Sequence, residues 1–199
     1  KVVKIIMQHI YVLLFLYLCS SMAKGFQETD TLCREIVSDV RKGIFSPVYL
    51  LMGDEPYYVD MVCDAIIEYC LDESEKDFNQ TVCYGSDVDA DAVITAARRY
   101  PMFADRQLVV VKEAQMMKTL EELAVYCAKP LDSTVLVISM HGARADKRKS
   151  LYKNVAKVGV VVDSTQLRDY EMPQWISMYY RNRGLNISPD AAALLGEHA

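Results

Sequence analysis

The sequence predicts an α/β domain with a largely parallel sheet, followed by the start of a smaller helical unit. Short apolar runs alternate with stretches of helical periodicity up to about residue 163. After residue 164 the strand-like runs cease and only helical patterns follow. Of the 199 residues, 52% are apolar and 25% charged, which is typical of a folded domain and excludes a disordered chain.

Two helices and two strands are predicted in the first 84 residues. The first helix begins at the capping residues Thr29 and Asp30 and ends in a basic turn followed by a glycine. The apolar run over 48–52 is typical of a buried strand. A helix over 57–71 repeats apolar side chains on one face, and the run over 78–84 alternates as a strand does.

The second half of the domain continues the alternation. Its predicted strands are the apolar, largely β-branched runs 107–111, 134–140 and 158–162. Its predicted helices are a stretch capped by Asp87 and Asp89 that ends at Arg99, a stretch over 116–128 and a basic helix over 145–156. The helical unit that follows contains a helix over 172–183 and a second that starts at Pro189 and continues through 191–195.

The first strand-to-helix turn lies where an α/β protein would hold a phosphate. A phosphate loop needs several glycines and a lysine. This turn has Gly53 alone, and Asp54 and Glu55 place negative charge there, while Pro56 removes an N–H donor. We therefore expect this degenerate phosphate loop to reject a nucleotide triphosphate.

The end of the strand over 107–111 is also unsuited to nucleotide hydrolysis. Such an enzyme needs an acidic magnesium ligand there, but Lys112 and Glu113 follow the strand. Both defects indicate an ATPase-like scaffold without ATPase chemistry. An unrelated α/β domain that never had a nucleotide site is the alternative.

Cysteine and histidine spacing predicts neither a metal site nor a nucleophilic enzyme. No Cys-x-x-Cys pair occurs, the three histidines are far apart, and no Gly-x-Ser-x-Gly elbow is present. We expect reduced, mostly buried thiols rather than disulfides, no metal and no cofactor. The cysteines are at positions 19, 33, 63, 70, 83 and 127.

Two further segments allow both a functional and a structural interpretation. Met102 and Phe103 follow a helix-breaking proline in a loop, where they either plug the core or form an exposed anchor for a partner. A basic segment either contacts DNA or an acidic partner, or is a solvated surface. Its cationic residues are Arg144, Lys147, Arg148, Lys149 and Lys153.

The N-terminus also leaves two interpretations open. Residues 1–21 combine a short basic stretch with a ten-residue apolar run, a pattern typical of a secretory signal peptide. Met22, however, opens a stretch typical of a cytosolic N-terminus. The segment is either an extension upstream of the true start or an export signal.

From Met22 onwards the chain resembles the delta-subunit family of bacterial DNA polymerase III clamp loaders. Four segments carry the resemblance in the same order and spacing over about 170 residues. They are residues 48–57 (VYLLMGDEPY), 100–111 (YPMFADRQLVVV), 146–153 (DKRKSLYK), and 175–176 (WI) with 183–191 (RGLNISPDA).

The resemblance implies an AAA+-like first domain over 22–163 that does not hydrolyse ATP, and a helical lid that starts within 164–199. It also implies a third, collar domain that lies beyond this sequence. In this family a hydrophobic pair opens the ring-shaped sliding clamp, and the matching residues are Met102 and Phe103, with Met where Leu is commoner.

The expected function is therefore that of a non-catalytic clamp-opening subunit within a DNA polymerase holoenzyme (a nucleotidyltransferase). Its expected partners are the sliding clamp, the other clamp loader subunits and DNA in the assembled complex, with no membrane. The resemblance favours a cytoplasmic protein and a wrongly extended start for residues 1–21. The alternatives are a DNA-binding module in repair or recombination and an exported protein.

Overall fold

The structure is a computed structural model that describes residues 25–198, and these residues belong to two compact units. The larger unit is Glu28–Thr165. The described part of the smaller unit consists of residues 25–27 and 166–198. The two interpretations of residues 1–21 concern a segment outside the described residues.

A five-stranded parallel sheet forms the centre of the larger unit, in the order β2-β3-β4-β1-β5. The three central strands, β1, β3 and β4, have largely apolar interiors and are buried almost completely, because helices cover both faces. The strands are β1 Val48–Gly53, β2 Gln80–Tyr84, β3 Gln107–Lys112, β4 Thr134–Ser139 and β5 Val160–Ser164.

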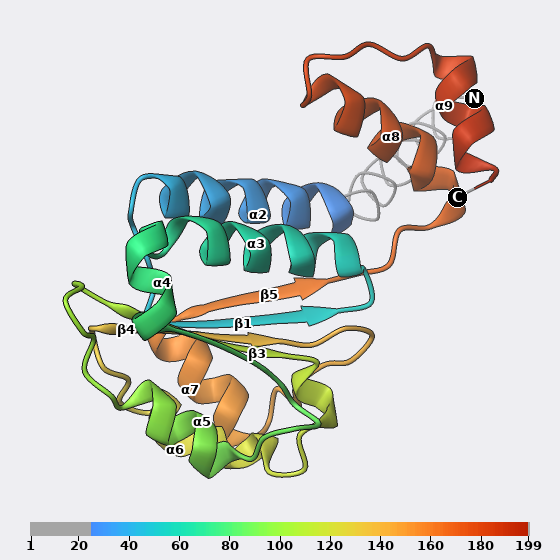
Figure 1. The fold of residues 1–199 in the computed structure, drawn as a ribbon. Coiled ribbons are helices and arrows are strands. Elements are labelled where there is room, and N and C mark those ends of the chain that lie inside the picture. The colour runs from blue at the N-terminus through green and yellow to red at the C-terminus, as the bar shows by residue number, and fades with distance from the viewer. Residues whose placement is uncertain (1–24, 199) are drawn as a thin grey trace, which may run out of the picture. The chain divides into compact units, whose positions relative to one another are not determined.

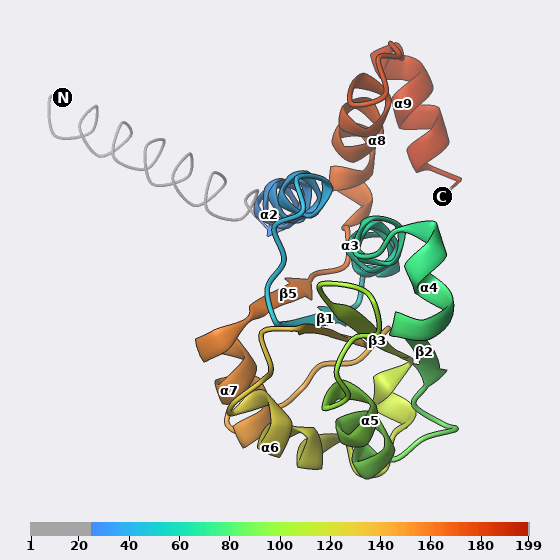
Figure 2. The same ribbon diagram turned by 60° about the vertical axis from the view of Figure 1, so that its left-hand side comes forward.

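Two layers of helices enclose this sheet. Helices α2 and α3 cover one face, and α5, α6 and α7 cover the other (Figures 1 and 2). The helices are α2 Gly25–Arg41, α3 Pro56–Tyr69, α4 Glu73–Asn79, α5 Ala90–Ala97, α6 Ala124–Cys127 and α7 Ser150–Val158. The α/β fold predicted from the alternating pattern is thus confirmed.

Two predicted boundaries in the first half are wrong. Helix α2 already begins at Gly25, and Asp30 forms an ion pair with Arg34 one turn later instead of capping the helix. The predicted strand 78–84 begins only at Gln80, because the polar helix α4 precedes it. A capping box between Asp72 and Glu75 starts that helix.

Two helices in the second half also differ from the prediction. The stretch 116–128 is divided into two 3-10 turns, Ala114–Met116 and Leu120–Leu123, and the short helix α6. The basic helix begins at Ser150 rather than at 145, because Ala143 pairs with Gly53 and a turn, in which the Lys149 N–H donates to the Asp146 carbonyl, precedes the helix. Most of the basic residues therefore lie in a loop.

The described C-terminal part of the smaller unit is helical, as predicted. A 3-10 turn, Asp169–Glu171, leads into α8, Met172–Arg181. Helix α9, Pro189–Gly196, packs against α8 and is capped by the Ser188 hydroxyl, which accepts a hydrogen bond from the Ala191 N–H.

Candidate functional site

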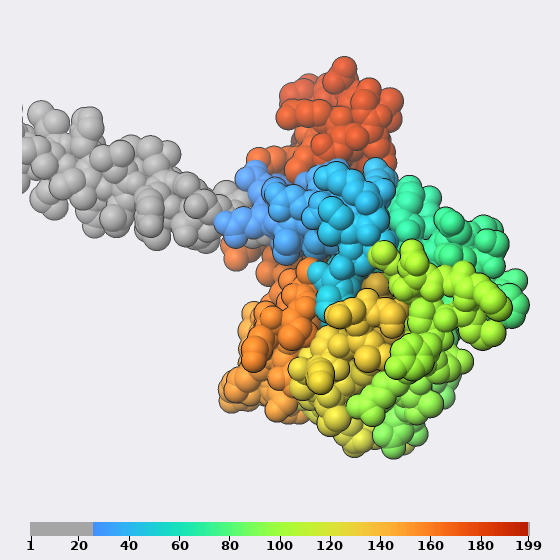
Figure 3. Space-filling model, turned by 90° about the vertical axis from the view of Figure 1, so that its left-hand side faces the viewer, coloured from blue at the N-terminus to red at the C-terminus, as the bar shows by residue number. Residues whose placement is uncertain are grey.

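The loop over residues 98–106, which we call the tip loop, joins α5 to β3 at the N-terminal end of the sheet. Figure 3 faces this end of the larger unit, and the light-green segment around residue 100 lies at the surface there. Phe103 is 99% exposed, Met102 is 52% exposed and Tyr100 is 82% exposed. The structure therefore places both predicted anchor residues in solvent and not in the core.

The backbone of the tip loop is unusual at Phe103. This residue has a φ of 56°, in the left-handed region that bulky side chains rarely adopt. Such a conformation persists only where the surroundings impose it. The loop is thus held in a shape that directs an aromatic ring into solvent.

Two buried carboxamide side chains hold the tip loop from below. Gln107 Nε2 donates to the Arg99 carbonyl at 2.5 Å and contacts Thr134 Oγ1 at 2.9 Å. Asn79, at the end of α4, binds both backbone polar groups of Met102. The loop is therefore fixed at its start and at the residue before Phe103.

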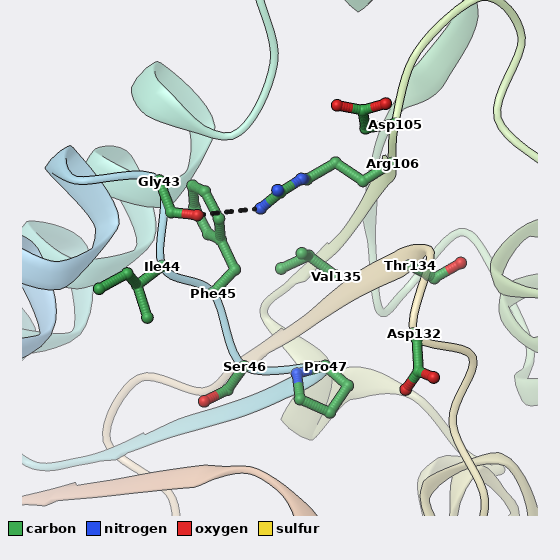
Figure 4. A pocket seen from close by; sticks show the side chains of 10 residues that line it. All are labelled: Gly43, Ile44, Phe45, Ser46, Pro47, Asp105, Arg106, Asp132, Thr134 and Val135. Carbon is green, nitrogen blue, oxygen red and sulfur yellow. Dashed lines mark hydrogen bonds between the residues drawn. The ribbon is translucent and has the colours of Figure 1, made fainter.

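The far end of the loop is held by Arg106, beside a cavity of about 430 Å³ (Figure 4). The Arg106 guanidinium lies 4.7 Å from the centre of the Phe45 ring, and its Nη1 donates to the Gly43 carbonyl at 3.4 Å. Asp105 and Asp132 also line the cavity. The three attachments leave the part of the loop around Phe103 as its most exposed portion.

The 53–56 turn lies at the opposite, C-terminal end of the sheet, and its backbone donors are already used. The Asp54 N–H donates to the Ser164 carbonyl at 3.0 Å, and the Glu55 N–H donates to the Ser164 hydroxyl at 3.3 Å. Gly53 has a φ of 131°, and a Cβ there would overlap the Ser164 carbonyl oxygen. Ser164 thus takes two N–H groups that a phosphate would need.

Arg144 covers this turn with a network of charges. Its guanidinium lies 2.8 Å from the Asp54 carboxylate and 2.7 Å from the Asp163 carboxylate, which also pairs with Lys147 at 2.8 Å. Burial acts to raise the pKa of Asp163, but the hydrogen bonds and charges from Lys147 and Arg144 outweigh it and hold the pKa below its ordinary value.

The other basic residues are also largely paired. Arg148 binds Asp146 at 2.9 Å, and Lys149 lies 3.6 Å from Glu121. Within residues 25–198, Lys153 forms no ion pair. A DNA contact through this segment stays a prediction, and the pairs lower the positive charge available for it.

At the end of β3 the structure places polar groups that bind one another. Lys112 Nζ lies 3.9 Å from the Asp64 carboxylate. His141 Nε2 lies 2.9 Å from Asp60, and its Nδ1 lies 3.6 Å from Glu113. These residues stand where a hydrolase would hold magnesium, yet no group of side chains suited to a metal ion occurs between residues 25 and 198.

The five described cysteines are free thiols. Burial raises the pKa to about 12 for four of them, so their thiolates are scarce near neutral pH and they do not fit a nucleophilic role. These four are Cys33, Cys63, Cys70 and Cys127.

The residues that support these two sites were not predicted from the sequence. Asn79 lies 23 positions from Met102, and Ser164 lies 109 positions from Glu55. One signal was available for Ser164, a small polar residue that ends an apolar strand. For Asn79, the capping box of Asp72 and Glu75 would have indicated that a helix begins shortly before it.

A sequence model of the family described as "DNA polymerase III, delta subunit" matches residues 49–165. The curated protein "DNA polymerase III subunit delta" of Bacillus subtilis (strain 168) is 25% identical over 168 residues, 79% of this chain and 48% of that protein. The match includes both the 53–56 turn and the tip loop.

A solved structure, that of the DNA clamp loader delta protein of Bacillus subtilis, is similar with a TM-score of 0.68 and 24% identity. It covers 82% of this chain and 51% of that chain. The likeness confirms the AAA+-like fold predicted from the resemblance. The chain spans about half the length of the relatives it matches. None of the helices within 25–198 has the length and apolar character needed to cross a membrane.

Proposed function

The chain belongs to the family of DNA polymerase III delta subunits, and from this premise we propose that it binds and opens the sliding clamp through Met102 and Phe103. The observation that carries the proposal is the complete exposure of Phe103 on a backbone with positive φ. Burial of a large exposed aromatic ring by a partner lowers the free energy of the complex, so such a ring is typical of a binding surface.

Burial of the tip supplies the free energy for the proposed opening. Each large apolar side chain that enters a pocket contributes about 1.5–3 kcal/mol. A clamp that binds the tip more tightly when its ring is open is shifted toward the open state by that difference in affinity. The two anchor side chains thus act as a wedge, and no bond of the clamp is cleaved.

The proposed role requires no ATP hydrolysis by this chain, within a holoenzyme that synthesises DNA. Supporting this, the Asp54 and Glu55 amides donate to Ser164, and Arg144 forms an ion pair with Asp54. Calorimetric titration with ATP and magnesium is expected to give no binding. Micromolar affinity would contradict this part of the proposal.

The remaining parts of the proposal concern the assembled complex. Residues 22–163 would be the clamp-binding domain and 164–199 the start of a lid, with the other clamp loader subunits as partners. DNA would be contacted only within that complex, in the cytoplasm. The ion pairs of the basic segment favour this assignment over an independent DNA-binding module.

Clamp binding tests the proposal directly. We expect Met102→Ala/Phe103→Ala to bind the sliding clamp of the same organism at least thirtyfold more weakly, as for central interface anchors worth about 2 kcal/mol or more. The matched control is Val125→Ala, because Val125 is an exposed apolar residue of α6, outside the tip loop. Equal binding by the double variant and the parent would overturn the proposal.

A further inference from the structure

Asn79 forms a two-way hydrogen-bonded pair with the backbone of the tip loop. Its Oδ1 accepts from the Met102 N–H at 2.6 Å, and its Nδ2 donates to the Met102 carbonyl at 2.9 Å. The second Nδ2 hydrogen reaches the Glu75 carbonyl of α4 at 3.1 Å. The side chain is buried, with 4% exposure.

No other side chain of this size offers the same set of bonds. A carboxamide supplies one acceptor and two donors, and here all of them are used. A carboxylate lacks the donor for the Met102 carbonyl, and a serine hydroxyl is too short to reach both groups. Asn79 therefore pairs with Met102 as a neighbouring strand would, although the tip loop is not part of the sheet.

The position of this pair matters because Met102 directly precedes Phe103. The left-handed conformation of Phe103 is unfavourable for a bulky residue, so a loop without attachments would populate other shapes. Affinity for a partner falls in proportion to the fraction of molecules that already have the binding shape. A bond that holds Met102 raises that fraction before any partner arrives.

We propose that Asn79 is a positioning residue, whose carboxamide keeps the tip loop in its clamp-binding shape in the uncomplexed protein. The inference rests on the proposed clamp binding by Met102 and Phe103. It adds a buried residue that acts through the backbone of the loop.

Binding kinetics distinguish positioning from direct contact. In Asn79→Ala we expect the association rate with the clamp to fall about tenfold, the effect of one to two lost hydrogen bonds, with the dissociation rate nearly unchanged. Met102→Ala/Phe103→Ala is expected instead to raise the dissociation rate. Asn79→Ser, whose hydroxyl cannot span both groups, is expected to behave as Asn79→Ala does.

Amide hydrogen exchange supplies a readout that needs no clamp. The Met102 amide is expected to exchange at least tenfold faster in Asn79→Ala, while amides in β3 and β4 keep their protection. Asn154→Ala is the matched control, because it removes a similar side-chain bond to the Ala124 carbonyl, 2.9 Å long, away from the loop.

The outcomes separate the two proposals. If Asn79→Ala frees the Met102 amide but leaves the association rate at the parent value, Asn79 has no positioning role, while clamp binding through Phe103 stands. An unchanged Met102 amide would also overturn the inference. If Met102→Ala/Phe103→Ala binds the clamp normally, the proposed function fails.

Discussion

The 53–56 turn and the tip loop lie at opposite ends of one parallel sheet and have opposite surface chemistry. At the C-terminal end, the turn's polar groups bind Ser164 and Arg144, so little is left for a ligand. At the N-terminal end, buried polar groups hold a loop whose apolar tip is exposed to solvent.

The difference shows that internal hydrogen bonds can have two effects. In the 53–56 turn they occupy the groups that would bind a ligand, and in the tip loop they hold apolar side chains in solvent. Parallel α/β sheets usually bind ligands at the carboxyl ends of their strands. Here the polar side chains at that end bind one another, and the exposed apolar side chains of the tip loop lie at the other end. The comparison predicts that changes at the turn lower stability and spare clamp binding, whereas changes at the tip do the reverse.

Gly53→Ala is expected to have the largest effect. The added Cβ would overlap the Ser164 carbonyl on a backbone that disfavours side chains, so the free energy of unfolding should fall by about 3 kcal/mol or more. Urea denaturation followed by circular dichroism measures the change.

Gly43→Ala is the matched control for Gly53→Ala. Gly43 also has a positive φ, 79°, but a Cβ there meets no atom within 4 Å, so about 1 kcal/mol is the expected loss. Equal losses in the two variants would show that close packing against Ser164 does not stabilise the turn.

Ser164→Ala is expected to have an intermediate effect. It removes the acceptor for the Glu55 N–H and a donor that lies 3.0 Å from the Glu55 carbonyl, so the loss should be about 1–2 kcal/mol. Clamp affinity of the folded variant should equal that of the parent. A weaker affinity would link the two ends of the sheet and break the comparison.

Asp163→Asn should have the smallest effect, and it should depend on pH. Because the pKa of Asp163 is lowered in the folded protein, its contribution to stability is present above the unfolded pKa of about 3.9 and is lost as pH falls through the folded value. Above pH 5 the free energy of unfolding of the parent should exceed that of the variant by up to about 1 kcal/mol.

Urea denaturation between pH 2.5 and 6 in steps, at constant ionic strength, measures this difference. The gap between parent and Asp163→Asn should shrink below pH 4. A gap that stays constant over the whole range would mean that the pairs with Arg144 and Lys147 contribute nothing to stability.

The fold could be predicted largely because each central strand contains a run of at least four apolar residues, as is typical of a buried parallel sheet. The short elements could not be predicted in the same way. Helix α4 is polar on most of its surface, and its capping box outweighs the lack of an apolar stripe. The segment before α7 looked helical, but its pairing with Gly53 depends on a long-range contact.

The residues of the candidate sites could be predicted from the sequence, but their exposure and their hydrogen-bond partners could not. The single glycine and the acidic pair of the 53–56 turn already indicated a poor phosphate site. The exposure of Met102 and Phe103 was undecided, because a loop pattern does not show which side faces the core. Asn79 holds Met102 through hydrogen bonds between residues 23 positions apart. The periodicity of a sequence does not reveal such a long-range contact.

Phe103→Gly tests the central claim most directly, because the claim predicts a large loss of clamp binding and little change in folding stability. Glycine accepts the left-handed backbone, so the free energy of unfolding should stay within about 1 kcal/mol of the parent. Affinity for the sliding clamp, measured on the same sample by surface plasmon resonance, should fall at least thirtyfold, the loss of about 2 kcal/mol expected for a central anchor. Parent-like affinity in a fully folded Phe103→Gly protein would contradict the account.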